Sequence, residues 1–105
     1  MTSGLGRVAA LEELREKDPA NTLTLLMLAN EYSKLARWSD AVAVLRDYLA
    51  RADDEGAAYR LLGNALRELG DEDAARNAFL QGAEAARRHR HDGMAAELES
   101  EARPI

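Results

Sequence analysis

The chain contains no cysteine, and this absence excludes disulfide bonds and metal sites built from thiolates. Proline is also scarce: Pro19 and Pro104 are the only two, so little interrupts a helix. The longest apolar run, Leu25 to Ala29, is far too short to cross a membrane, and the first residues carry no apolar stretch of signal-peptide length. We therefore expect a cytoplasmic protein that does not enter a membrane.

The composition favours one soluble, all-α domain. The 105 residues are 47% apolar, with alanine prominent, and 31% charged. Helix formers dominate and β-branched residues are few, which predicts helices rather than strands. The net charge of −5 disfavours binding to nucleic acid, because the phosphate backbone attracts basic proteins.

The apolar pattern of residues 25–45 returns in residues 59–79, at a spacing of 34 residues. The matching pairs are Leu25 and Tyr59, Ala29 and Gly63, Tyr32 and Leu66, Ala41 and Ala75, and Leu45 and Phe79. A repeat of this length with two helical patterns per period is typical of a solenoid built from helix pairs.

Each helical pattern places apolar residues at i, i+3, i+4 and i+7, which is one face of an α-helix. The four sets are Leu25, Leu28, Ala29 and Tyr32; Ala41, Val44, Leu45 and Tyr48; Tyr59, Leu62, Gly63 and Leu66; and Ala75, Ala78, Phe79 and Gly82. Between them, Asn21 or Thr22, Ser39 and Asp71 are the expected N-caps, and Gly70 is the expected helix stop. Short links predict that consecutive helices pack antiparallel.

These residues resemble the tetratricopeptide repeat family. Residues 56–89 match its pattern as Tyr59, Leu62, Gly63, Ala75 and Phe79, and residues 22–55 match as Leu28, Tyr32 and Ala41. Here Leu25, Leu45 and Leu66 replace aromatic residues of the pattern, and Ala29 replaces its glycine. The resemblance implies a right-handed α-solenoid of antiparallel helix pairs, like the small stand-alone bacterial members of the family.

The flanks extend the repeat on both sides. One period before the second helix of the first repeat, Arg7, Ala10, Leu11 and Leu14 form a matching stripe, which predicts a half-repeat helix over 5–17. After Asp92, an expected cap, Met94, Ala95, Leu98 and Ala102 form a stripe out of register. We expect a capping helix over 92–102, because terminal repeats need a shielded face. The pattern therefore predicts one domain, residues 1–105, of about six helices.

We expect no catalytic residues, no cofactor and no metal. Ser33 is the one serine well inside a predicted repeat helix, and no histidine is near it in sequence. The run Arg87 to His91 has three interpretations: an anion site, a metal site, or cations that complement a helix C-terminus. His89 and His91 lie about 200° apart on a helix and cannot share a metal there. The third interpretation is favoured, because the helix is expected to end at this run.

The resemblance also implies a concave groove lined by the first helix of each repeat. Its predicted residues are Leu23, Leu26, Asn30, Ser33 and Lys34, followed by Ala57, Arg60, Asn64, Arg67 and Glu68. Lys34, Arg60 and Arg67 make this surface locally cationic, so an acidic peptide or a free C-terminus is the expected ligand.

The leading functional hypothesis is a non-catalytic module that binds another protein, as a peptide or helix, in this groove. The alternative is a structural subunit or homo-oligomer that acts through its helix surfaces, with the open N-terminal half-repeat or Trp38 as the candidate interface. RNA binding has only the run Arg87 to His91 in its favour.

Overall fold

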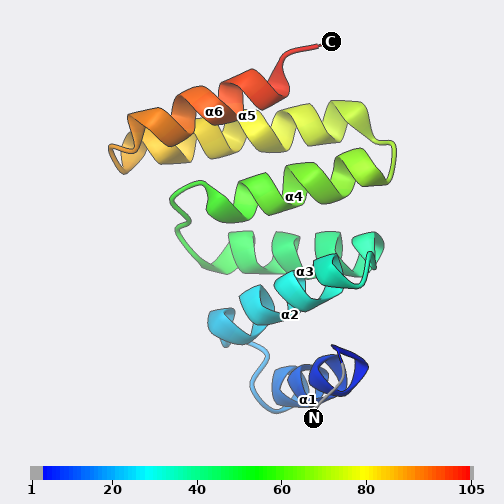
Figure 1. Ribbon diagram of the computed structural model, residues 1–105. Helices are drawn as coiled ribbons and strands as arrows, with labels where there is room; N and C mark the ends of the chain where they lie inside the picture. The colour runs from blue at the N-terminus through cyan, green and yellow to red at the C-terminus, as the bar shows by residue number, and fades with distance from the viewer. Residues whose placement is uncertain (1–3, 105) are drawn as a thin grey trace. The chain divides into compact units, whose positions relative to one another are not determined.

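The computed structural model describes residues 4–104, and every regular element in that range is an α-helix (Figure 1). The helices are α1 (Gly4–Lys17), α2 (Thr22–Lys34), α3 (Trp38–Arg51), α4 (Ala57–Glu68), α5 (Glu72–Arg88) and α6 (Asp92–Ala102). The predicted all-α helical-repeat fold is confirmed. The division into a half-repeat, two repeats and a capping helix stays a prediction.

The contacts divide the chain into two compact units, Met1–Ala52 and Asp53–Ile105. In the first unit α2 packs against both α1 and α3, and in the second unit α5 packs against both α4 and α6. Figure 1 shows α4, α5 and α6 running across the second unit in alternating directions. Each unit is therefore a set of three helices joined by short turns, as short helix connections require.

The predicted apolar stripes form the core of each unit. On α2 all four stripe residues are buried, and on α5 all four are buried as well. Tyr48 on α3 and Tyr59 on α4 are only half-buried. On α6, Ala95, Leu98 and Ala102 are buried and Met94 is half-buried, so the predicted out-of-register stripe is correct.

The stripe predicted on α1 is wrong, because of its four residues only Leu11 is buried. Leu14 is 51% exposed and Ala10 is exposed, whereas Val8 and Leu11 are buried at 2% and 4% exposure. Polar residues of α1 also bond to α2 and α3. Glu12 accepts a hydrogen bond from the Tyr32 hydroxyl at 2.9 Å, and Arg15 pairs with Asp47 at 3.1 Å. Periodicity alone missed this face, because half of it is polar.

Two of the predicted caps are confirmed. The Asn21 side chain accepts a hydrogen bond from the Thr24 amide at 3.2 Å, and the Asp71 side chain accepts one from the Ala74 amide at 3.2 Å. Both bonds satisfy amides that have no partner within the first turn of a helix. Gly70, just before Asp71, has φ +82, the left-handed conformation expected of a helix stop.

The other two predicted caps are wrong. α3 begins at Trp38, with Arg37 as its N-cap, so Ser39 already lies inside the helix. α6 begins at Asp92 with His91 as its N-cap, and neither cap position makes a side-chain cap bond. Asp92 instead places a carboxylate in the first turn, where it complements the positive end of the helix dipole.

The tightest packing in the second unit lies where α4 crosses α5. A Cβ built on Gly63 would lie 2.6 Å from Cε1 of Phe79, and Phe79 itself is fully buried. Only a glycine lets the aromatic ring sit against the α4 backbone at this point. The equivalent positions of the first repeat hold Ala29 and Leu45, both fully buried. There leucine replaces the larger phenylalanine, and alanine, with its methyl group, replaces the glycine.

Candidate functional site

One face of α2 exposes large apolar side chains. Leu23 is 63% exposed, Met27 is 46% exposed, Leu26 is half-buried and Asn30 is exposed. These four residues follow the spacing i, i+3, i+4 and i+7, so they form one stripe opposite the buried one; we call it the α2 face. Met27 was not among the predicted groove residues, although its spacing of four from Leu23 was a usable signal.

The polar groups predicted on α2 are bound within their own helix. The Asn30 side-chain amide donates to the Leu26 carbonyl at 3.0 Å, and the Ser33 hydroxyl donates to the Ala29 carbonyl at 2.8 Å. Lys34 forms an ion pair of 3.3 Å with Glu31. The α2 face therefore offers mainly apolar contact.

Glu31 is the most buried charged residue among those described, at 7% exposure. Its carboxylate is held by Arg7 at 3.4 Å and by Lys34 at 3.3 Å. Arg7 and Glu31 stand one period before Ala41 and Ala65, which are both fully buried. Arg7 stands where the two repeats have the alanines Ala41 and Ala75, and its ion pair with Glu31 accounts for this larger, charged residue.

The cations predicted on α4 are paired with α6. Arg60 reaches Glu97 at 2.7 Å, and Arg67 reaches Glu101 at 2.9 Å and the Glu101 main-chain carbonyl at 2.8 Å. We call these four residues the α4–α6 ladder. The other predicted α4 residues, Ala57, Asn64 and Glu68, are exposed. The local positive charge expected from the sequence is therefore largely neutralised within the chain.

Arg67 also lies on the wall of a cleft of about 550 Å³ in the second unit. Its guanidinium sits over the Phe79 ring, 4.8 Å from the ring centre, which fixes its position. The cleft is lined by Arg67, Glu72, Asp73, Arg76, Ser100, Glu101, Ala102, Arg103 and Pro104. Within residues 4–104, Arg76 and Arg103 form no ion pair. No sequence pattern predicted this cleft, because three different helices and the segment after α6 form it.

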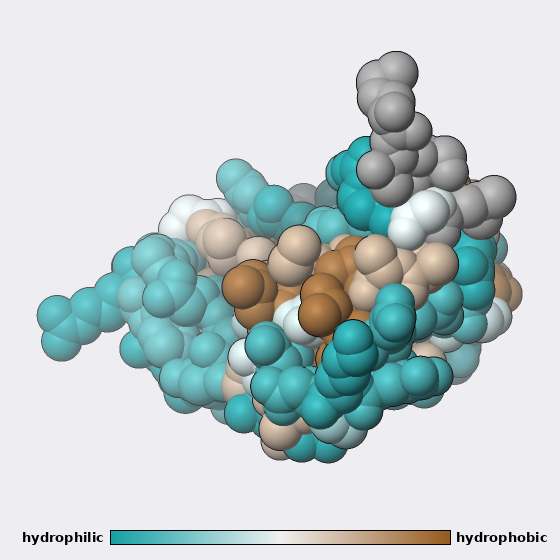
Figure 2. All heavy atoms as spheres, turned by 90° about the horizontal axis from the view of Figure 1, so that it is seen from below, coloured by the Kyte–Doolittle hydropathy of each residue, from teal (hydrophilic) through white to brown (hydrophobic). Residues whose placement is uncertain are grey.

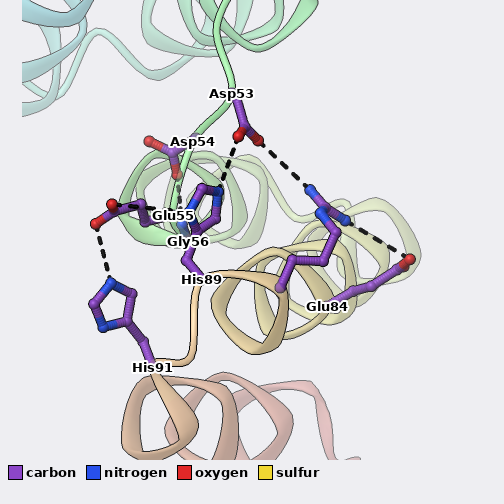
Figure 3. Close-up of polar contacts among 8 residues, drawn as sticks. Asp53, Asp54, Glu55, Gly56, Glu84, His89 and His91 are labelled. Atoms are coloured by element: carbon purple, nitrogen blue, oxygen red, sulfur yellow. Dashed lines mark hydrogen bonds and ion pairs between the residues drawn. The ribbon is translucent and has the colours of Figure 1, made fainter.

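The basic run Arg87 to His91, at the turn between α5 and α6, contacts the segment before α4 (Figure 3). His89 Nε2 lies 3.0 Å from an Asp53 oxygen, and His91 Nε2 lies 3.1 Å from a Glu55 oxygen. Arg88 reaches Asp53 at 3.8 Å and Glu84 at 3.7 Å. These partners make the run a set of internal contacts rather than an open anion site.

The end of the helix agrees with the favoured interpretation of this run. α5 ends at Arg88, so Arg87 and Arg88 lie in its last turn, where cations complement the helix dipole. Arg87 pairs with Glu99 of α6. Among the described residues, no group of three or more histidine, cysteine or acidic side chains is arranged to hold a metal ion. The helices described also include none long and apolar enough to cross a membrane.

Comparison with known proteins supports the fold. No family model matches the chain, and no curated protein matches it. Among solved structures, it is similar to the crystal structure of MamA, with a TM-score of 0.67 and 20% sequence identity. The match covers 94% of this chain and 66% of the MamA chain. MamA contains tetratricopeptide repeats, and the likeness shows that this chain has a helical fold like theirs.

Proposed function

We propose that this helical-repeat chain is a non-catalytic protein-interaction module that binds a peptide or a partner helix. The proposed binding residues are the α2 face with Ser33 and Lys34 in the first unit. In the second unit they are Ala57, Arg60, Asn64, Arg67 and Glu68 of α4. We also propose, as the resemblance implies, that the α2 and α4 residues line one groove. The fold likeness supports it only in general terms, because function resides in sites rather than in folds.

The observation that carries this proposal is the exposure of Leu23 and Met27. Scattered apolar side chains are normal on a protein surface, but these two lie one turn apart and flank the half-buried Leu26. An amphipathic helix or an extended peptide that covers them removes apolar area from water, at about 25 cal/mol per Å². The α2 face therefore supplies the apolar part of the interaction.

The second unit supplies polar recognition. Asn64 is exposed on α4, and its side-chain amide offers both a donor and an acceptor to a peptide backbone. Arg67, Arg76 and Arg103 line the cleft and suit a carboxylate. These features support an acidic segment or a free C-terminus as the ligand, although Glu72, Asp73 and Glu101 share the same cleft.

A selection from a random peptide library tests the proposal. Peptides that bind the wild type are measured by calorimetry against Leu23→Gln with Met27→Gln, which keeps helix propensity while removing the apolar contact. We expect at least a tenfold loss of affinity. The matched control is Leu69→Gln with Leu80→Gln, because these leucines are 47% and 44% exposed elsewhere. Equal affinity in both double variants would refute binding on the α2 face.

The alternative function, a structural subunit or homo-oligomer, has one observation in its favour. Figure 2 looks onto the face that α1 forms and shows apolar side chains gathered there with hydrophilic ones around them. Leu14, 51% exposed, belongs to α1, as does the exposed Ala10. If this alternative holds, light scattering at high protein concentration will show a dimer or larger species that Leu14→Gln dissociates. A monomer at every concentration refutes it.

A further inference from the structure

The α4–α6 ladder places two carboxylates of the chain on two cations of the proposed binding surface. Glu97 and Glu101 lie one turn apart on α6, and Arg60 and Arg67 lie two turns apart on α4. The pairs are short, at 2.7 Å and 2.9 Å. Glu97 and Glu101 therefore occupy the positions beside Arg60 and Arg67 that the carboxylates of an acidic ligand would need.

α6 does not depend on these pairs for its place in the second unit. Its inner stripe packs extensively against α5, with Leu98 fully buried and Ala95 at 1% exposure. Met94 and Leu98 lie close to the backbone of Gly56 and Gly82. Apolar burial of this kind outweighs an exposed ion pair. The two carboxylates are presented by a fixed helix, and their removal leaves that helix packed.

The ion pairs are also weak enough to exchange. The side chains of Arg60 and Glu97 are 38% and 68% exposed, and those of Arg67 and Glu101 are 39% and 49% exposed. Pairs with this exposure are screened by water and salt, so each contributes little free energy. A ligand carboxylate that arrives with other contacts displaces them at small cost. The cleft beside Arg67, with Arg76 and Arg103 on its wall, leaves room for such a carboxylate.

We infer that Glu97 and Glu101 act as a built-in competitor that lowers the affinity of Arg60 and Arg67 for an acidic partner helix with two carboxylates one turn apart. This inference rests on the acidic ligand of the proposed function. The spacing of the ligand's carboxylates follows from α6 itself, because the i, i+4 spacing of Glu97 and Glu101 already satisfies both arginines. A ligand with one carboxylate displaces one pair only.

The test uses the full chain and a synthetic helix-forming peptide with two glutamates four residues apart. Its affinity is measured by fluorescence anisotropy for the wild type and for Glu97→Gln with Glu101→Gln. The variant frees both arginines, so we expect affinity to rise by about 2- to 30-fold, the range given by two exposed ion pairs. A peptide with glutamines at both positions is expected to show no gain.

The matched control is Glu84→Gln with Glu99→Gln. It changes the net charge by the same amount and removes the ion pairs to Arg88 and Arg87, and it leaves α4 untouched. We expect its affinity to equal that of the wild type. Glu97→Gln alone is a second variant in case the double variant folds poorly, and it is expected to show part of the gain, because it frees only Arg60.

The outcomes separate the inference from the function on which it rests. If the peptide binds the wild type and Glu97→Gln with Glu101→Gln with equal, measurable affinity, Glu97 and Glu101 do not compete with the ligand. The proposal of an acidic ligand is then still supported. An equal gain in the control pair also overturns the inference, because net charge alone then explains the effect. If the peptide binds none of the proteins, both the competitor and the acidic ligand fail. Binding on the α2 face is then judged by the library-selected peptides.

Discussion

The first two helices of each unit meet through different kinds of contact. α1 meets α2 through polar contacts as well as apolar ones: the Tyr32 hydroxyl donates to Glu12, and Arg7 holds the nearly buried Glu31. α4 meets α5 through close apolar packing, with Gly63 against the Phe79 ring. One period after Tyr32 and Glu31, the second unit has Leu66 and Ala65, both buried.

The difference shows which part of the pattern is fixed and which is adaptable. The small and large apolar positions recur in both units because they set how closely two helices approach. Polar residues are tolerated at a repeat position where a partner of opposite charge or a hydrogen bond is available. Arg7 and Glu31 meet this condition, and no buried side-chain polar atom among the described residues lacks a hydrogen-bond partner.

The largest expected effect tests whether the second unit depends on its apolar contact. Phe79→Ala removes a fully buried ring and leaves a cavity against α4, so we expect the free energy of unfolding to fall by about 3–5 kcal/mol. Leu80→Ala, at the next residue but 44% exposed, should cost less than about 1 kcal/mol. Denaturant unfolding measures both. Similar losses would contradict the assignment of Phe79 as the core of this interface.

A second prediction concerns variants that give the second unit the alanine and leucine found at the equivalent positions of the first. Gly63→Ala places a Cβ 2.6 Å from the Phe79 ring, and we expect a loss of about 1–3 kcal/mol from overpacking. Adding Phe79→Leu reproduces the Ala29 and Leu45 combination of the first repeat, so it should recover part of that loss. A double-mutant cycle by thermal unfolding measures the coupling. Additive effects would show that the glycine and the ring do not depend on each other.

The smallest effect at neutral pH tests the polar interface of the first unit. Tyr32→Phe removes the hydrogen bond to Glu12 and should cost about 1 kcal/mol. Burial, and then this hydrogen bond, raise the pKa of Tyr32 from 10.0 to about 12. The neutral hydroxyl therefore stabilises the fold fully below pH 10, and this contribution is lost as the pH rises through about 12.

Alkaline unfolding distinguishes this contribution from general base denaturation. Between pH 10 and 12 the wild type should lose more stability than Tyr32→Phe, because Tyr32 ionises first in the unfolded state. Tyr59→Phe is the control, since the Tyr59 hydroxyl makes no hydrogen bond within residues 4–104. The tyrosinate absorbance gives the titration directly. A pH dependence that is unchanged in Tyr32→Phe would exclude Tyr32 as its source.

The helices and most of their buried faces were predictable from the sequence. The stripes of α2 and α5 are buried at every predicted position, because periodicity reports which residues of one helix face the same way. The prediction failed on α1, where the contact with α2 includes the exposed Glu12 through its hydrogen bond with Tyr32. A residue such as Leu14 looks like core in a periodic pattern and is exposed when the packed face is half polar.

The candidate site was predictable only in part. The family resemblance placed Leu23, Leu26 and Asn30 on one helix face, and all three belong to the α2 face, where they are exposed or half-buried. The predicted positive charge of Arg60 and Arg67 took no account of α6, because Glu97 and Glu101 are 37 and 34 residues away in sequence. Arg76 and Arg103 likewise join the cleft from separate elements.

By itself the sequence determined the all-α repeat, the helix faces, and the turns at Asn21 and Asp71, because these depend on residues within one or two helical turns of each other. Only the tertiary structure decided the charge of the α4 surface, the partner of Arg7 and the fit of Gly63 to Phe79. Those features depend on distances between helices, and a spacing along the chain does not report which side chains of neighbouring helices meet.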